Sequence, residues 1–196
     1  TANGLETVRI GTSPQSLSSS YSTVTGCFFE SCNGEVETIS VKSCNNYVLN
    51  NTLYNKLHET VKNLDVIRFE IIGSNGFTGL HASGYDGITF ENNEFEAIMA
   101  TTGKVDNAVD WGASAKFMFC TNIKFIRNNF RGAHATLVWF QDSKNALFMN
   151  NVFWNTNQYD DNCSAIRLVN QYGDKVVKNI AFLYNTFYLE NNVNTQ

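Results

Sequence analysis

One short motif recurs along this chain and limits the folds that the chain can adopt. Each copy is an alternating apolar segment, then an asparagine, then a phenylalanine or leucine two residues later. The aligned positions are separated by 24, 42, 35, 23 and 34 residues, and they are Cys27 in a degenerate first copy, then Asn51, Asn93, Asn128, Asn151 and Asn185. Self-similarity at such intervals is typical of a solenoid.

The motif predicts an all-β chain folded as a right-handed, single-stranded parallel β-helix. Each alternating segment indicates a short strand with one face turned inward. Asparagine tolerates left-handed backbone conformations and can hydrogen-bond its equivalent in the next coil. We therefore expect a ladder of asparagines with stacked phenylalanines beneath it. A β-sandwich is the main alternative, but its strands do not share one bend motif.

The spacing of the copies predicts one domain over residues 1–196. The first coils span 1–53, an inserted loop or short helix spans about 54–65, and further coils span 66–196. Loops inserted at the side of such a stack are where binding sites sit. Neither end shows the polar cap that a solenoid needs, so we expect an uncapped part of a longer chain, with oligomer or filament contacts open to its ends.

Composition excludes several classes of partner. The formal net charge of −4 gives no reason to expect nucleic acid or an anionic membrane surface. No apolar run is long enough to span a bilayer, so membrane insertion is not expected. The five cysteines include no C-x-x-C pair, which argues against a zinc site or a redox dithiol. They are expected to be buried thiols that pack as small apolar residues.

The stretch 33–43 carries the residues with the clearest chemistry. Glu35 and Glu37 share one face if this stretch is a strand, because residues two apart point the same way. Two adjacent carboxylates repel each other unless a cation such as Ca²⁺ lies between them. Lys42 follows and could act as a base. The alternative is a solvated strand face with a surface lysine.

The order of several short segments adds a resemblance to a known family. Segments 3–13, 33–37, 39–44 and 50–52 follow one another at characteristic spacings. Taken together, residues 3–53 resemble polysaccharide lyase family six, the chondroitinase B and alginate lyase family of right-handed β-helices. The resemblance implies β-elimination on an acidic, uronate-containing polysaccharide of the alginate or chondroitin/dermatan type. It also implies an extracellular or periplasmic location. The remainder resembles generic β-helix repeats.

The resemblance also implies residue roles. In such lyases a Ca²⁺ neutralises the uronate carboxylate, a lysine removes the C5 proton, and an arginine assists the leaving oxygen. Carried over by motif, the metal ligands are Asn3, Glu35 and Glu37, and Lys42 is the base. Arg9 is expected to bind substrate.

The chain departs from the family pattern at the arginine. The expected neighbourhood, residues 59–64, contains none. The next strand, 66–71, carries Arg68 and Glu70 on one face, so Arg68 could take the missing role if it stacks over the strand that carries Glu37. The alternative is that Arg68 merely pairs with Glu70 or with the acids of the coil below.

Two further residues are candidates for substrate binding. His81 lies in a Gly-rich loop that lacks the strand-to-helix context of a phosphate loop, and it is either a substrate-binding imidazole or a solvated loop residue. Trp111 follows two aspartates and either stacks on a pyranose ring or anchors its loop.

Two other functions remain open on the same scaffold, because a fold alone does not decide function. One is a non-catalytic structural, adhesive or glycan-binding module. The other is a uronate epimerase or a glycoside hydrolase, of which the hydrolase would need two carboxylates set across a cleft.

Overall fold

The computed structural model describes residues 6–30, 32, 37–54, 65–70, 87, 89–96, 113–131, 136–154, 165–170 and 177–188. These residues form β-strands and one short 3₁₀ helix, Ser13–Gln15. A search of this part of the chain for a helix long and apolar enough to cross a membrane finds none.

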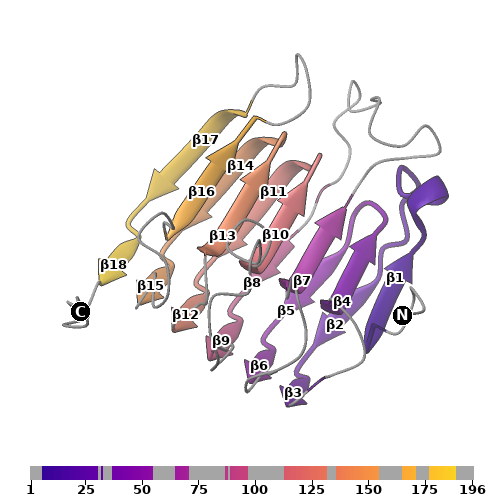
Figure 1. Cartoon of the computed structure of the whole chain (residues 1–196), viewed down its shortest axis with the longest axis horizontal. Coiled ribbons are helices and arrows are strands. Elements are labelled where there is room, and N and C mark those ends of the chain that lie inside the picture. Colours follow the sequence, from indigo (N-terminus) through magenta and orange to yellow (C-terminus); the bar gives the residue numbers. More distant parts are fainter. Residues whose placement is uncertain are drawn as a thin grey trace, which may run out of the picture.

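The strands form three parallel sheets of six strands each (Figure 1). The first sheet contains β1 (Val8–Gly11), β4 (Glu37–Lys42), β7 (Asp65–Glu70), β10 (Ala113–Met118), β13 (Thr136–Gln141) and β16 (Ile166–Val169). The second contains β2 (Thr23–Thr25), β5 (Tyr47–Leu49), β8 (Thr89–Glu91), β11 (Thr121–Ile126), β14 (Lys144–Met149) and β17 (Lys178–Leu183). The third contains β3 (Phe28–Glu30), β6 (Thr52–Tyr54), β9 (Glu94–Glu96), β12 (Asn129–Arg131), β15 (Val152–Trp154) and β18 (Thr186–Tyr188).

The chain visits the three sheets in turn, so each set of three consecutive strands, called a coil below, adds one strand to every sheet. Neighbouring strands within a sheet are therefore three apart in sequence order, and all of their pairings are parallel. The all-β prediction is confirmed, and the parallel sheets are consistent with the β-helix that the motif predicted.

Aromatic stacks fill the interior at the predicted positions. Phe90 stacks on Phe125 with ring centroids 5.0 Å apart, and Phe148 lies 5.1 Å beyond Phe125. A second stack joins Phe130 to Phe153 at 5.6 Å. All five rings are fully buried. Since burying one phenylalanine side chain stabilises a fold by roughly 1.5–3 kcal/mol, these rings account for much of what holds adjacent coils together.

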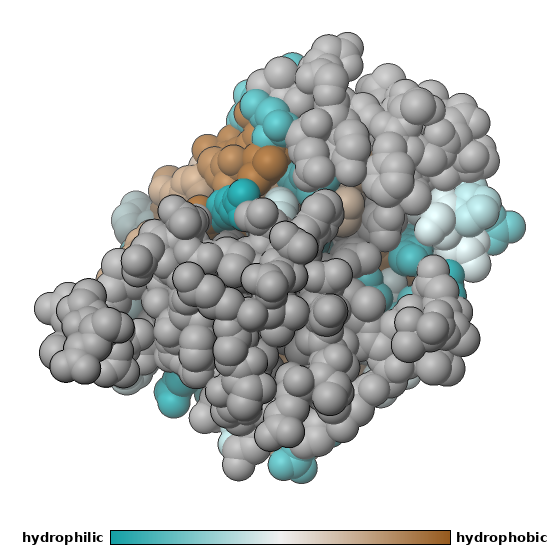
Figure 2. Space-filling model, viewed as in Figure 1, coloured by the Kyte–Doolittle hydropathy of each residue, from teal (hydrophilic) through white to brown (hydrophobic). Residues whose placement is uncertain are grey.

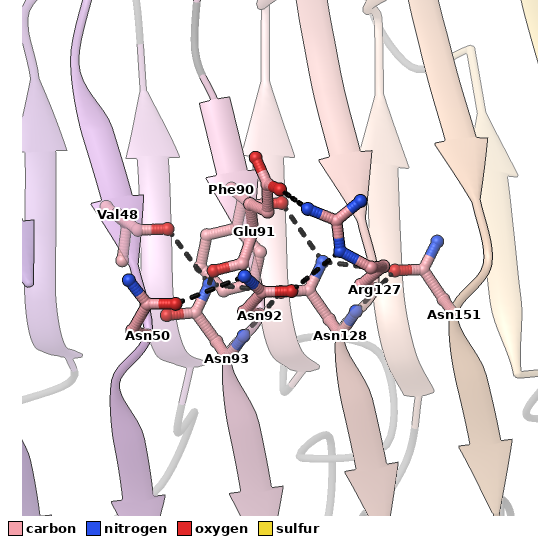
Figure 3. Close-up of polar contacts among 9 residues, drawn as sticks. All are labelled: Val48, Asn50, Phe90, Glu91, Asn92, Asn93, Arg127, Asn128 and Asn151. Carbon is pink, nitrogen blue, oxygen red and sulfur yellow. Dashed lines mark hydrogen bonds and ion pairs between the residues drawn. The ribbon is translucent and has the colours of Figure 1, made fainter. Parts of the chain in front are cut away.

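The predicted asparagine ladder is confirmed (Figure 3). In each rung the side-chain oxygen accepts from both the backbone N–H and the side-chain amide of the preceding ladder asparagine. For Asn93 and Asn128 these two distances are both 3.0 Å. The side-chain amide of Asn128 also donates to the Phe90 carbonyl at 3.0 Å. The ladder thus satisfies buried polar groups that would otherwise be costly.

The left-handed residue at each bend is not the ladder asparagine but the residue before it. Asn50, Asn92, Arg127, Asn150 and Tyr184 all have φ between 53° and 56°. Figure 3 shows the resulting outer row, in which Asn92 donates to Asn50 while Arg127 contacts Asn92 and the Glu91 carboxylate. Each bend therefore uses two residues, one for backbone geometry and one for the ladder.

The cysteine prediction holds for only some of the thiols. Cys44 and Cys120 are buried, as expected, whereas Cys27 is exposed and Cys32 is intermediate. Cys27 occupies the first ladder position, where its backbone N–H donates to the Asn51 side chain.

Candidate functional site

The outer face of the first sheet carries the predicted base. In β4, Ile39 and Val41 are fully buried in the core, and alternation puts Ser40 and Lys42 on the opposite face. Lys42 ends the strand. Its position pairs with Gly11 of β1 in the parallel register.

The register brings the two predicted arginine positions to the same row as Ser40. Arg9 of β1 pairs with Ser40, and Ser40 pairs with Arg68 of β7. Neighbouring strands lie about 4.8 Å apart, so these positions are immediate neighbours across the sheet. Val41 pairs with Phe69, and the next positions along the two strands are therefore Lys42 and Glu70. The side chain of Arg68 lies outside the described part of the structure.

Gly11 fixes how closely β1 approaches the end of β4. Its φ is +82°, and a Cβ there would lie 2.2 Å from the main-chain oxygen of Lys42. Only glycine fits, because it has no Cβ and adopts positive φ without strain. The main-chain position of Lys42 therefore depends on this glycine in the preceding coil.

Lys42 and Glu37 are both buried. Lys42 is 7% exposed and Glu37 is 5% exposed. Both take part in interactions within the protein. Glu37 is the first residue of β4, in phase with the core residues Ile39 and Val41 and out of phase with Lys42. A straight strand would send the carboxylate and the amine to opposite faces, so their convergence would require a bend at the start of β4.

Arg9 is the most exposed of the predicted site residues whose side chains the structure describes. Its guanidinium lies 3.9 Å from the carboxylate of Glu6, a pair in which the arginine side chain is 38% exposed. The Glu6 side chain is only 1% exposed and neither of its oxygens has a hydrogen-bond partner among the described residues, so Arg9 supplies the counter-charge of a buried carboxylate. Moving Arg9 away from Glu6 would leave that buried carboxylate without a counter-charge, which is costly.

Four predicted site residues, Asn3, Glu35, His81 and Trp111, lie outside the described residues. Of the three expected Ca²⁺ ligands the structure thus describes only Glu37. Within residues 6–188, counting only those that the structure describes, no group of three His, Cys, Asp or Glu could hold a metal ion. Two carboxylates and an amide oxygen are nevertheless the donors that Ca²⁺ prefers, so the chemistry of the set fits the ion.

The row of strand positions that contains Arg9, Ser40 and Arg68 continues into a cation–aromatic cluster that the sequence analysis did not predict. The register runs from Arg68 to Lys116, then to Trp139 and Arg167. Lys116 Nζ lies 4.4 Å from the centroid of the Trp139 ring, and Arg167 Cζ lies 4.5 Å from it. Lys116 and Trp139 are almost completely buried. The cluster ties three coils together through cation–π contacts.

A sequence signal for this cluster existed. Lys116 and Trp139 are 23 residues apart, which is also the spacing of the ladder residues Asn128 and Asn151. Applied to the first sheet, the same 23-residue interval predicts that Lys116 and Trp139 are neighbours in adjacent strands.

Comparison with known families bears on the first half of the chain. Residues 1–94 match the family model of chondroitinase B. This segment is thus similar to polysaccharide lyase family six, and it is just under half of the 196 residues. The match extends well beyond residue 53, where the resemblance noted from the sequence ended, and it includes Arg9, Lys42 and Arg68. It excludes Trp111 and the Lys116 cluster. No curated protein and no solved structure matches the chain significantly.

Proposed function

We propose that this protein is a Ca²⁺-assisted lyase that cleaves uronate-containing polysaccharide by β-elimination outside the cytoplasm. Its scaffold would be a single right-handed parallel β-helix. The observation that carries the proposal is the chondroitinase B match over residues 1–94, since it covers the coils whose register makes Arg9, Ser40 and Arg68 neighbours beside Lys42.

In this reaction Lys42 Nζ takes the C5 proton of the uronate. The electron pair of the C5–H bond forms a C4=C5 double bond, the C4–O bond breaks, and the leaving oxygen takes a proton from solvent. Arg68 would stabilise the negative charge that develops on that oxygen. Arg9 would bind a carboxylate of a neighbouring sugar with paired hydrogen bonds. A Ca²⁺ held by Asn3, Glu35 and Glu37 would supply neutralisation of the reacting carboxylate.

The burial of Lys42 supports one rival, a non-catalytic glycan-binding or structural module. A general base must come within hydrogen-bonding reach of the proton that it removes. An amine that is 7% exposed meets this condition only if the groups around it give way to the polymer. The phase of Glu37, which differs from that of Lys42, supports the same rival.

One assay distinguishes the lyase from the non-catalytic module. The protein is incubated with alginate, chondroitin sulfate and dermatan sulfate, and the ultraviolet absorbance of the C4=C5 product is followed with and without a chelator. A lyase gives a chelator-sensitive rise that Lys42→Ala abolishes. The matched control is Lys124→Ala, which removes an exposed lysine from the outer face of β11 and should leave the rate unchanged. Binding to one of these polymers without any absorbance rise would establish the non-catalytic module instead.

A further inference from the structure

Glu6 carries a buried carboxylate that lacks the hydrogen bonds such a group needs. Its side chain is 1% exposed, and neither oxygen accepts a hydrogen bond from a described residue. The Arg9 guanidinium lies 3.9 Å away, which is beyond the roughly 2.7–2.9 Å of a charge-assisted hydrogen bond. Burying a carboxylate is costly unless it is both paired and hydrogen-bonded. The oxygens of Glu6 therefore call for a further partner.

The register of the first sheet puts Glu6 beside other acidic residues. Val8 of β1 pairs with Ile39 of β4. Glu6 lies two residues before Val8, and Glu37 lies two residues before Ile39. Glu37 is 5% exposed, and its position pairs with that of Asp65 in β7. Three acidic residues thus hold equivalent positions in three neighbouring coils, whose strands are about 4.8 Å apart.

A divalent cation is the partner that suits these carboxylates. Neighbouring carboxylates repel each other, and a bound cation removes the repulsion and offsets the loss of hydration. Ca²⁺ binds about six to eight oxygen atoms, of which a carboxylate can supply two. The expected ligands Asn3, Glu35 and Glu37 supply fewer than this, since an amide gives one oxygen and each carboxylate at most two. The coordination shell of the ion therefore has room for Glu6.

A cation at Glu6 also changes what Arg9 can do. In the structure Arg9 pairs with Glu6, whereas the proposed function requires Arg9 to bind a carboxylate of the polymer. A cation supplies the counter-charge of Glu6 instead, and its positive charge repels the guanidinium. The Arg9 side chain is 38% exposed, so it can turn toward a polymer at the surface. Figure 2 shows hydrophilic surface at the right, where β1 and the 3₁₀ helix lie in Figure 1, whereas apolar surface gathers at the upper left.

We propose that Glu6 is a further ligand of the Ca²⁺ and that the ion, by pairing with Glu6, releases Arg9 to bind a carboxylate of the polysaccharide. This inference rests on the Ca²⁺ of the proposed function, but it requires no elimination step and holds equally for a glycan-binding module. The ion and the polymer then bind cooperatively, because each favours the arrangement in which Arg9 is turned away from Glu6.

Calorimetric titration of the full chain with Ca²⁺ tests the ligand. Glu6→Gln keeps the shape of the side chain and should lower the affinity for Ca²⁺ by more than about tenfold, because a charged ligand is lost. The matched control is Glu94→Gln, which removes an exposed carboxylate from β9 and should change the affinity less than about twofold. Glu6→Asp keeps the charge but withdraws the oxygens, so it should also weaken binding. Circular dichroism establishes that each variant is folded.

Chemical modification of arginine by phenylglyoxal, mapped by peptide mass spectrometry, tests the release of Arg9. Ca²⁺ should speed the modification of Arg9 in the natural chain, measured against the exposed Arg131 as internal reference. In Glu6→Gln the modification should be fast with and without Ca²⁺. The proposal is overturned if Glu6→Gln binds Ca²⁺ as tightly as the natural chain, or if Ca²⁺ leaves the Arg9 rate unchanged.

These outcomes are distinguishable from a failure of the proposed function. Normal Ca²⁺ binding by Glu6→Gln removes Glu6 from the ligand set and leaves the Ca²⁺-assisted lyase intact. A natural chain that binds no Ca²⁺ overturns both this inference and the role of the ion in the reaction. The absorbance assay on the natural chain decides separately whether β-elimination occurs.

Discussion

Replacing Asn128 with alanine removes one rung from the buried ladder without touching any strand. Its side-chain oxygen accepts from the backbone N–H and the side-chain amide of Asn93, both at 3.0 Å. Its side-chain nitrogen donates to the Phe90 carbonyl at 3.0 Å and to the Asn151 side chain at 3.1 Å. The residue is 1% exposed, so water cannot replace these bonds. Alanine leaves the Asn93 N–H without its acceptor and deprives the Phe90 carbonyl of this donor.

The expected loss of stability follows from those two groups. A buried polar group left unsatisfied costs about 1–3 kcal/mol, so the substitution should cost roughly 2–6 kcal/mol. That is a large fraction of the roughly 5–15 kcal/mol by which native domains are stable. With a urea dependence of about 2 kcal/mol per molar, the unfolding midpoint should fall by roughly 1–3 M.

Urea unfolding followed by far-ultraviolet circular dichroism measures this loss. The matched control is Asn92→Gly, at the bend residue directly before Asn93. The Asn92 side chain is exposed, and its φ of +54° suits glycine. The control should cost less than about 1 kcal/mol, because solvent replaces the lost hydrogen bonds. If Asn128→Ala costs no more than the control, the ladder does not stabilise the stack and the reasoning is wrong.

Two further predictions concern the first sheet and one concerns the ion. Gly11→Ala should lower the free energy of unfolding by more than about 2 kcal/mol in the same urea assay, because a Cβ would lie 2.2 Å from the Lys42 oxygen at a φ of +82°; an unchanged midpoint would contradict the close approach. Trp139→Leu should lower the free energy of unfolding by about 1–3 kcal/mol, because both cation–π contacts are lost. A double-mutant cycle with Lys116→Met should show coupling between the two substitutions, and additive effects would refute the contact between Lys116 and Trp139. Added Ca²⁺ at about 100 times its dissociation constant should stabilise the protein by about 2.7 kcal/mol, seen as a higher melting temperature, and Glu37→Gln should reduce that shift; equal shifts in both proteins would exclude Glu37 as a ligand.

Much of the scaffold could be predicted because its signal is local and repeated. Stacked coils must place equivalent residues above one another, so a residue that works in one rung recurs in the next. Asn51, Asn93 and Asn128 predict the ladder in this way, and the leucine or phenylalanine two residues after each predicts the apolar stack. The same logic paired Arg68 with the strand that carries Lys42, because both lie in alternating segments of neighbouring coils.

The site could be predicted less completely, since its geometry depends on phase and coverage. Glu37, the expected metal ligand, and Lys42, the expected base, stand five residues apart. An odd separation puts two side chains on opposite faces of a straight strand, and the expectation that both belong to one site did not account for this. The cluster of Lys116 with Trp139 and Arg167 needs the register of three strands at once, and intervals of unequal length between coils obscure that register in the sequence.

The periodicity of the sequence by itself determined the strands, the ladder and the inward rings. Hydrogen bonding and stacking between adjacent coils require equivalent residues in every repeat, so the pattern is visible in the sequence. Only the three-dimensional arrangement decided that Lys42 is nearly enclosed, that Arg9 pairs with Glu6, and that Phe182 and Phe187 of the last coil are partly exposed. These properties depend on what packs against a residue from distant parts of the chain, and no pattern within a single coil encodes that.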